Sequence, residues 1–243
     1  MSYYPGIEFS LFLLFDGIVS VTTAFIVYLK DRKYILNKIT SLALFFFAFF
    51  FISEALIYLF APLELSNSLF ILNLFRDAIL FFAYLATVTL IISSFYLRRG
   101  EDFVKRPIFL IILIFISLVG LSFAWYYDWV SIVNQEIFFE NNFPASIGIF
   151  VIPGAFVLIS LGEFLLLSKK VDSPLLRRKI QLIVVGLLFI FAGQIYYGIV
   201  ETLGMRRNIL FFFGHILYFL ADIVILFVFM KAENDSSDII DKE

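Results

Sequence analysis

Seven ionisable side chains lie inside long apolar stretches of this sequence. They are Asp16, Glu54, Arg76, Asp77, Glu163, His215 and Asp222. On insertion scales each costs roughly 2.5–3.5 kcal/mol at the middle of a membrane-spanning helix, so such residues normally face protein or water and often mark a function. Proton exchange, binding of a cation and recognition of a small polar ligand are the chemistries open to a set dominated by carboxylates.

Most of these groups fall at one depth. With a rise of about 1.5 Å per residue, each lies roughly 9–12 Å inward from the outer end of its helix. We predict that they converge on a ligand-binding pocket in the outer half of a helix bundle. The predicted pocket residues are Asp16, Glu54, Arg76, Asp77, Gln194, Tyr197 and His215. Asp222 lies deeper, and we expect either a proton or ion relay or a hydrogen-bonded neutral acid there.

Polar residues also recur at helical spacing, which places them on one face of each helix. These stripes are Asp16, Ser20 and Thr23; Asn73, Asp77, Tyr84, Thr87 and Ser94; Gln194, Tyr197 and Glu201; and His215, Tyr218 and Asp222. They favour a polar interior that opens outward. The alternative is a purely structural network in which Arg76 pairs with the acids. Because one Arg and one His cannot cheaply pair three acids, we expect at least one acid to be hydrated, protonated or bound to a cation. Glu163 is expected to pair with loop arginines.

The elements that must position these groups are membrane-spanning helices. The chain is 62% hydrophobic and 16% charged, with a mean hydropathy of +1.01. Its apolar blocks have the length of about 20 residues that crosses a bilayer. We predict spans at Phe9–Leu29, Ile39–Phe60, Leu69–Leu97, Ile108–Tyr126, Ser146–Leu167, Ile180–Leu203 and Ile209–Met230, with a kink near Pro153. The fold class is therefore all-α: one seven-helix domain over residues 1–230, then a short acidic tail, 231–243.

The distribution of Lys and Arg predicts the orientation. Of 18 such residues, 15 flank the odd-numbered loops or lie in the tail, and only Arg206 and Arg207 flank the other side. Cytoplasmic loops carry this excess. We therefore expect the N-terminus outside and the C-terminus in the cytoplasm of a cell membrane, in a multi-pass protein.

Two loops carry further signals. In Tyr127–Ala145, helical spacing of Trp129, Ile132, Val133 and Ile137 predicts a short helix, either resting on the outer headgroups or acting as a lid. In the fifth loop, Ser173 can cap a helix and Pro174 fits its first turn, so the sixth span should begin in the cytoplasm. The basic collar that follows is a topological anchor, a lipid-headgroup contact or a docking site for a cytoplasmic partner. Its basic residues are Arg177, Arg178 and Lys179.

Several classes of site are excluded. The sequence has no cysteine and one histidine, so no thiolate site, bis-histidine haem or three-histidine zinc site can form within one copy. The last span has no lysine before Lys231, which removes a retinal Schiff base. We expect no catalytic residues, metal or cofactor and no binding of nucleic acid.

The segment SPLLRRKIQLIVVGLLFIFAG resembles the matching stretch of the seven-helix sensor regions of prokaryotic histidine kinases. In both, an Arg-rich loop with a Gln, here Arg177, Arg178 and Gln181, precedes an apolar helix that contains a Gly, here Gly186. The resemblance implies a sensor. Because no kinase or cyclase sequence follows the last span, it implies a sensor that acts alone or signals through partners.

The sequence thus favours a non-enzymatic membrane receptor or sensor with a small extracytoplasmic ligand and a cytoplasmic protein partner. A cation- or proton-coupled transporter or channel component would use the same carboxylates. A structural subunit of a larger membrane complex would instead use the many apolar side chains, which include 34 Phe. The oligomeric state is not predicted.

Overall fold

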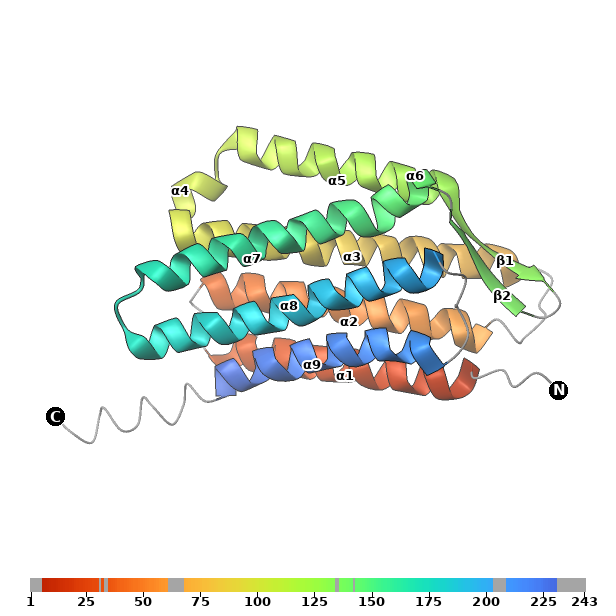
Figure 1. The fold of residues 1–243 in the computed structure, drawn as a ribbon, viewed down its shortest axis with the longest axis horizontal. Helices are drawn as coiled ribbons and strands as arrows, with labels where there is room; N and C mark the ends of the chain where they lie inside the picture. Colours follow the sequence, from red (N-terminus) through yellow and green to blue (C-terminus); the bar gives the residue numbers. More distant parts are fainter. Residues whose placement is uncertain are drawn as a thin grey trace.

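Long helices make up most of the protein, as a computed structural model shows for residues 6–30, 32, 35–60, 68–133, 136–141, 143–202 and 209–230. The long helices are α1 (Gly6–Lys30), α2 (Ile35–Phe60), α3 (Ser68–Arg99), α5 (Pro107–Tyr127), α7 (Ile152–Lys170), α8 (Pro174–Thr202) and α9 (Ile209–Met230). They run lengthwise side by side (Figure 1). Shorter elements are α4 (Glu101–Val104), α6 (Phe143–Ser146) and the π-helical turn η2 (Ile147–Val151).

Six of the described helical segments are long and apolar enough to cross a membrane, and they coincide with the first six predicted spans. The seventh predicted span coincides with α9, a helix of 22 residues. Its described side chains, from Phe213 to Val228, form a shorter apolar stretch. A predominantly helical architecture with six helices able to cross a membrane is therefore confirmed for the described residues, whereas the seventh crossing stays a prediction.

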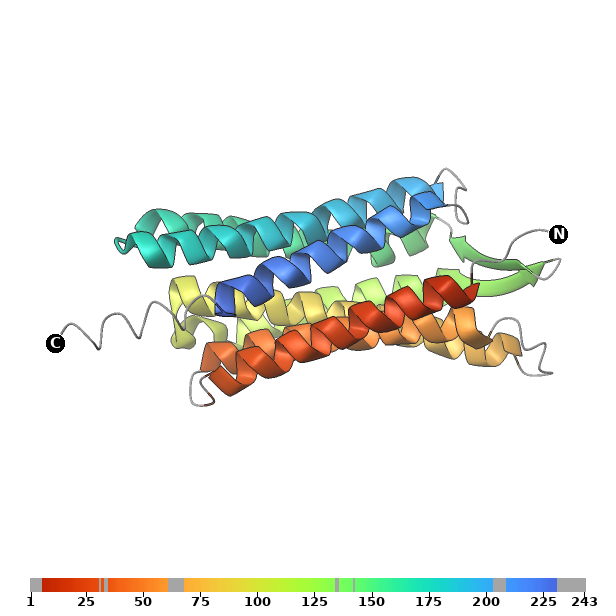
Figure 2. The same ribbon diagram turned by 90° about the horizontal axis from the view of Figure 1, so that it is seen from below.

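Six of the long helices close into a ring. In order, α1 packs on α2, α2 on α3, α3 on α7, α7 on α8, α8 on α9 and α9 back on α1. Side chains from all six helices form the largest buried apolar cluster inside it. Helix α5 lies outside the ring, against α3 and η2 (Figure 1). Figure 2 shows α9 between α8 and α1, where it closes the ring. The site must therefore be sought inside this ring.

Two tyrosines and two glycines join α8 to α9 at close range. The rings of Tyr197 and Tyr218 are stacked, with centroids 5.9 Å apart and an interplanar angle of 12°. A Cβ added at Gly214 would lie 2.6 Å from Cζ of Tyr197, and one added at Gly193 would lie 3.1 Å from Cζ of Tyr218. Each ring thus occupies space that the other helix leaves free by having no side chain there.

The fourth loop is not helical, so the predicted interfacial helix is wrong. Strands β1 (Asp128–Val133) and β2 (Glu136–Asn141) pair antiparallel, with Asp128 opposite Asn141 and Val133 opposite Glu136. Both runs are rich in β-branched and aromatic residues, which favour strands. The helical spacing seen in the sequence is also met by chance in such a run.

Proline and serine act at two helix starts. The π-helical turn η2 ends just before Pro153, which has no N–H to donate and so disturbs the preceding turn. At the other start, α8 begins at Pro174, and the N–H of Leu176 donates to the Ser173 hydroxyl at 3.4 Å. The predicted helix start at Ser173 and Pro174 is confirmed, and its cytoplasmic location stays a prediction. Near Pro153 the structure has a π-helical turn, and the predicted kink stays a prediction.

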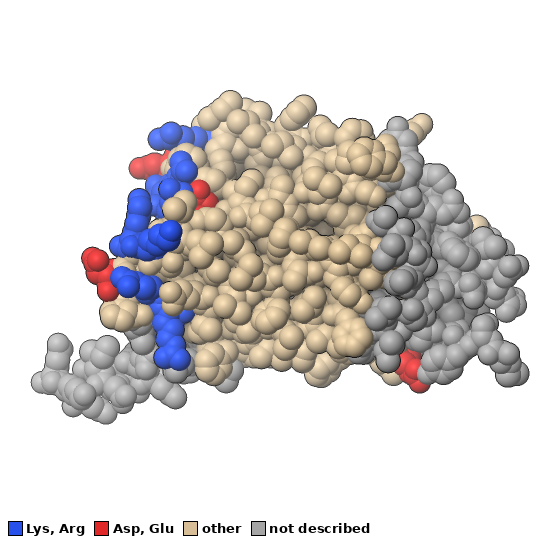
Figure 3. Space-filling view, in the orientation of Figure 1, with Lys and Arg blue, Asp and Glu red and all other residues tan. Residues whose placement is uncertain are grey.

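The charged side chains are sorted by position along the bundle. Figure 3 shows the described Lys and Arg residues of this face gathered at one end, with a wide belt free of charges beside them. This is the end at which α9 finishes, and α1 begins at the opposite end. The described loops therefore agree with the prediction that the basic loops lie at one end of the bundle. The second and sixth loops and the tail lie outside the described residues.

Candidate functional site

The central feature inside the ring is a buried pair of Glu54 on α2 and His215 on α9. Nε2 of His215 lies 3.5 Å from Oε1 of Glu54, and the His215 side chain has no exposed surface. The two side chains form an ion pair only when His215 is protonated, and burial reduces the screening of such a pair by water. The two predicted site residues thus come together across the ring.

An aromatic frame surrounds the imidazole. The centroids of Phe9, Phe51, Tyr197 and Tyr218 lie between 4.9 and 6.2 Å from that of His215. These rings come from α1, α2, α8 and α9, so four helices fix the orientation of one side chain. The frame excludes water from His215 and leaves few directions in which its ring can move.

Two further buried carboxylates, Asp16 and Asp222, come from the same ring of helices. Asp16 on α1 is fully buried, and it lies within electrostatic range of Asp222 and Glu54. Among the described residues, neither oxygen of Asp16 has a hydrogen-bond partner. Asp222 is also buried, and the hydroxyl of Ser20 donates a hydrogen bond to its Oδ2. Three acids from α1, α2 and α9 therefore share the interior of the ring.

This arrangement can hold positive charge. Asp16 lies within electrostatic range of both other carboxylates in a buried interior, and the cost of this arrangement falls when a proton or a small cation neutralises one of the acids. Within the described residues, no group of three or more His, Asp or Glu side chains is arranged to hold a metal ion.

Gln194 belongs to a different place from these acids. It lines a groove of about 360 Å³ between α7 and α8 whose other walls are apolar. The sequence put Gln194 in the same pocket as Asp16 and His215, because depth along a helix says nothing about the direction in which a side chain points. Gln194 is therefore assigned to the groove and not to the acid cluster.

Arg76 and Asp77 lie on α3, where Arg76 is buried and Asp77 is partly buried. Both have interaction partners. Their membership of the acid cluster stays a prediction. Another member of the predicted α3 stripe points elsewhere, since the Tyr84 hydroxyl donates to the Gly148 carbonyl of η2 at 2.6 Å. At this position the stripe therefore faces α5 and η2.

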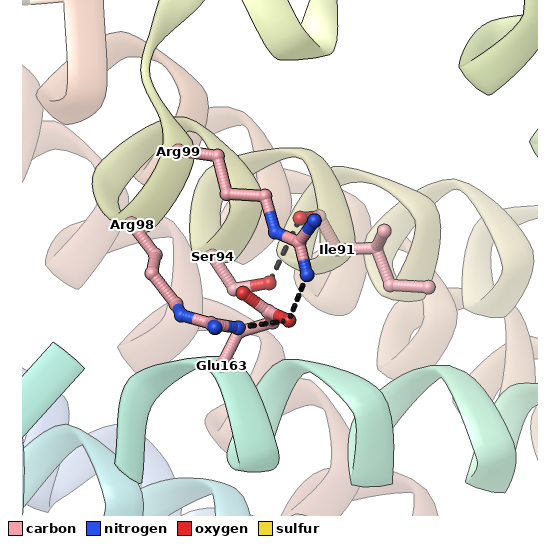
Figure 4. A network of polar contacts seen from close by, with 5 residues as sticks. All are labelled: Ile91, Ser94, Arg98, Arg99 and Glu163. Carbon is pink, nitrogen blue, oxygen red and sulfur yellow. Dashed lines mark hydrogen bonds and ion pairs between the residues drawn. The ribbon is translucent and has the colours of Figure 1, made fainter. Parts of the chain in front are cut away.

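Glu163 joins α7 to the basic end of α3. Its Oε1 lies 2.6 Å from Nη1 of Arg98 and 3.5 Å from Nη2 of Arg99 (Figure 4). The predicted pairing with loop arginines is confirmed, and Glu163 itself is buried. This network ties two neighbouring helices of the ring together at one end.

The predicted basic collar lies at the start of α8. Arg177 and Arg178 are exposed, and Lys179 is partly buried. The guanidinium of Arg177 donates to the Val171 carbonyl, at 3.2 Å through Nε and 2.9 Å through Nη2. Elsewhere at this end, a hydrogen bond from Lys105 to Glu101 and the charge of Glu101 raise the pKa of Lys105. The exposed side chains of Arg177, Arg178 and Lys105 are accessible to a binding partner.

Sequence reasoning predicted Tyr197 as a site residue, and the structure places it beside His215. It missed Phe9 and Phe51 of the aromatic frame and the glycines that make room for the two tyrosines. A repeated Gly-x-x-x-Tyr pattern, Gly193 to Tyr197 and Gly214 to Tyr218, was the available signal. It also left Ser20 in a polar stripe without assigning it to Asp222. The hydroxyl and the carboxylate are 202 residues apart in the chain, so only the fold reveals their contact.

Comparison with known proteins adds no assignment. No protein-family model matches the sequence, and neither curated proteins nor solved structures give a significant match to the chain.

Proposed function

We propose that the chain is a non-enzymatic seven-helix membrane protein of the sensor type, with its N-terminus outside and its C-terminus in the cytoplasm. The gathering of the described loop Lys and Arg residues at the end where α9 finishes supports this orientation, because cytoplasmic loops carry the excess of positive charge. The cell membrane is its proposed location.

The sensing element is the acid cluster of Asp16, Glu54 and Asp222 with His215. The observation that carries this proposal is the full burial of Asp16, without a hydrogen-bond partner among the described residues, beside two other carboxylates. Gain or loss of one positive charge changes the repulsion between α1, α2 and α9. A proton or a small cation from the outer side would therefore shift the packing of these helices, which is how a ligand biases a two-state element.

The output surface is the basic end of the bundle. Arg177, Arg178 and Lys179 lie on the first turns of α8, whose other end carries Tyr197 of the aromatic frame. A change of packing around His215 can be passed along this rigid helix. An acidic segment of a cytoplasmic protein is the partner that such a surface would bind. The resemblance to the sensor regions of histidine kinases agrees with this role.

A proton- or cation-coupled transporter is the second candidate, because its acids would lie, as here, on different helices around one interior. The two functions differ in whether protons or cations cross the membrane. A sensor changes shape without moving charge across the membrane, whereas a transporter moves it. A structural subunit would do neither.

Spin labels can test the proposal because the chain contains no cysteine. Two cysteines replace the exposed Lys38 on α2 and Leu176 on α8, and the labelled protein is placed in liposomes that carry a pH-sensitive dye inside. When the outside is acidified, we expect the distance between the labels to shift while the inside pH stays constant. Asp16→Asn and Asp222→Asn should abolish the shift, and Glu101→Gln, an exposed acid on α4, should retain it.

Other results would contradict the sensor. Acidification of the interior that Asp222→Asn removes would identify a transporter. A constant distance together with no flux would leave the structural subunit as the leading interpretation.

A further inference from the structure

A groove lies on the side of the bundle between α7 and α8, away from the acid cluster. Its volume of about 360 Å³ falls within the range of roughly 300–1,000 Å³ found for small-molecule sites. Gly154 on α7 and Gly198 on α8 are among its lining residues, and Phe150 and Phe191 contribute aromatic walls. The groove begins at the π-helical turn η2, a type of irregularity that often occurs at functional sites.

The groove opens onto the apolar side of the bundle. Val151, Leu158 and Ile195 line it and are themselves exposed. They lie on helices that are long and apolar enough to cross a membrane. If α7 and α8 span the bilayer, a ligand reaches this groove from the lipid and is therefore largely apolar itself.

One polar group interrupts these apolar walls. Oε1 of Gln194 is shielded from solvent and has no hydrogen-bond partner among the described residues. An unsatisfied buried acceptor costs roughly 1–3 kcal/mol, so a group that supplies a donor here is favoured. Rotation about the last torsion of a glutamine side chain is nearly free, so either end of the carboxamide can be turned toward the groove.

We propose that this groove binds a lipophilic alcohol, a molecule with an extended or fused apolar body and one hydroxyl group. A hydroxyl both donates and accepts, so it can pair with either end of the Gln194 carboxamide. The apolar body would lie against Phe150 and Phe191. Neither a charged headgroup nor a highly polar metabolite suits walls in which one amide is the main polar feature.

A side chain introduced at Gly154 can fill part of the groove without disturbing the fold. A Cβ added at Gly154 would lie 3.5 Å from Oε1 of Gln194 and 3.8 Å from Phe191, which are ordinary van der Waals contacts. Gly162, two turns further along α7, has no atom within 4 Å of an added Cβ and does not line the groove. Gly154→Val and Gly162→Val are therefore a matched pair of test and control.

The test uses the full chain in lipid nanodiscs and a long-chain alcohol that carries a diazirine. After irradiation, mass spectrometry of peptides locates the label. We expect labelling at residues 150–158 and 191–198, reduced by excess unlabelled alcohol and reduced about fivefold less effectively by the corresponding methyl ether, which cannot donate to Oε1 of Gln194. Gly154→Val should reduce labelling at least fivefold, and Gly162→Val should leave it unchanged.

Gln194→Leu tests the polar contact separately. It should weaken competition by the alcohol roughly fivefold, the effect of losing one ordinary hydrogen bond, and bring it close to that of the ether. If Gly154→Val does not fold, Gly154→Ala replaces it, with labelling reduced to a smaller degree. These variants leave Asp16 and Asp222 intact, so the response to acidification should persist in them, and the two proposals can fail separately.

Three results would overturn the proposal. Labelling spread evenly over α5 and the other exposed helices would indicate annular lipid only. Equal labelling in the Gly154→Val and Gly162→Val proteins would place the probe outside the groove. Disulfide formation between two chains that carry Leu158→Cys, at a position exposed in the groove, would show that a second copy occupies it.

Discussion

Tyr197 and Tyr218 lie on adjacent helices with their rings nearly parallel, and each ring is set over a glycine of the other helix. Each glycine precedes the tyrosine of its own helix by four residues, so the arrangement is reciprocal. The rings also form two walls of the frame around His215. The packing of α8 on α9 and the position of the imidazole therefore depend on the same four residues.

The reciprocal packing predicts that Gly214→Ala destabilises the protein. The new Cβ would lie 2.6 Å from Cζ of Tyr197, so the ring must move, and overpacking of this kind costs about 1–3 kcal/mol. Thermal unfolding in one detergent measures the change. Gly162→Ala is the control, and it should stabilise α7 by roughly 0.5–1 kcal/mol because the position is open. A Gly214→Ala protein that melts no earlier than wild type would contradict this account.

The fold follows from signals that act locally along the chain. The length of each apolar block and the pair Ser173–Pro174 predict helices that the structure contains, because a helix satisfies its own backbone groups. The helix predicted from the spacing of Trp129 to Ile137 is wrong, and strands β1 and β2 form there instead. Spacing alone cannot distinguish a helix from a strand when the residues are β-branched or aromatic. A helix-propensity argument would have favoured the hairpin there.

The candidate site is only partly predictable, for a geometric reason. Depth correctly places Asp16, Glu54 and His215 in one layer, since depth depends on residue number alone. Direction depends on which helices are neighbours. Gln194 faces α7 and Tyr84 faces η2, and neither neighbour can be read from the spacing of residues within one helix. The order of helices in the ring is the information that the sequence lacks.

Neutralising Glu163 should destabilise the protein more than neutralising an exposed acid. Glu163→Gln leaves Arg98 and Arg99 without their carboxylate, and breaking a buried pair costs roughly 3–5 kcal/mol. The partial exposure of both arginines lowers this cost, so we expect a loss above about 1 kcal/mol. Glu101→Gln breaks the surface pair with Lys105 and should cost about 0–1 kcal/mol. Chemical unfolding that gives equal losses would mean that Glu163 is hydrated.

Single cysteines can test the orientation, since the chain has none of its own. A cysteine at Ser131 in β1 should react with a membrane-impermeant maleimide added to intact cells. Cysteines at Arg106 and Lys170, at the basic end, should react only after the membrane is permeabilised. Reaction of Lys170→Cys in intact cells, with Ser131→Cys protected, would reverse the proposed topology.

The hydrogen bond from Ser20 to Asp222 predicts an energetic coupling between the first and last helices. Ser20→Ala removes the donor from a buried carboxylate, which should cost about 1–3 kcal/mol of stability. Thr22→Ala is the control, because Thr22 is exposed and donates only to the Ile18 carbonyl of its own helix. In a double-mutant cycle with Asp222→Asn, the two changes should be non-additive by at least about 0.5 kcal/mol. Thermal unfolding of the four proteins gives this term, and strict additivity would show that the hydroxyl and the carboxylate act independently.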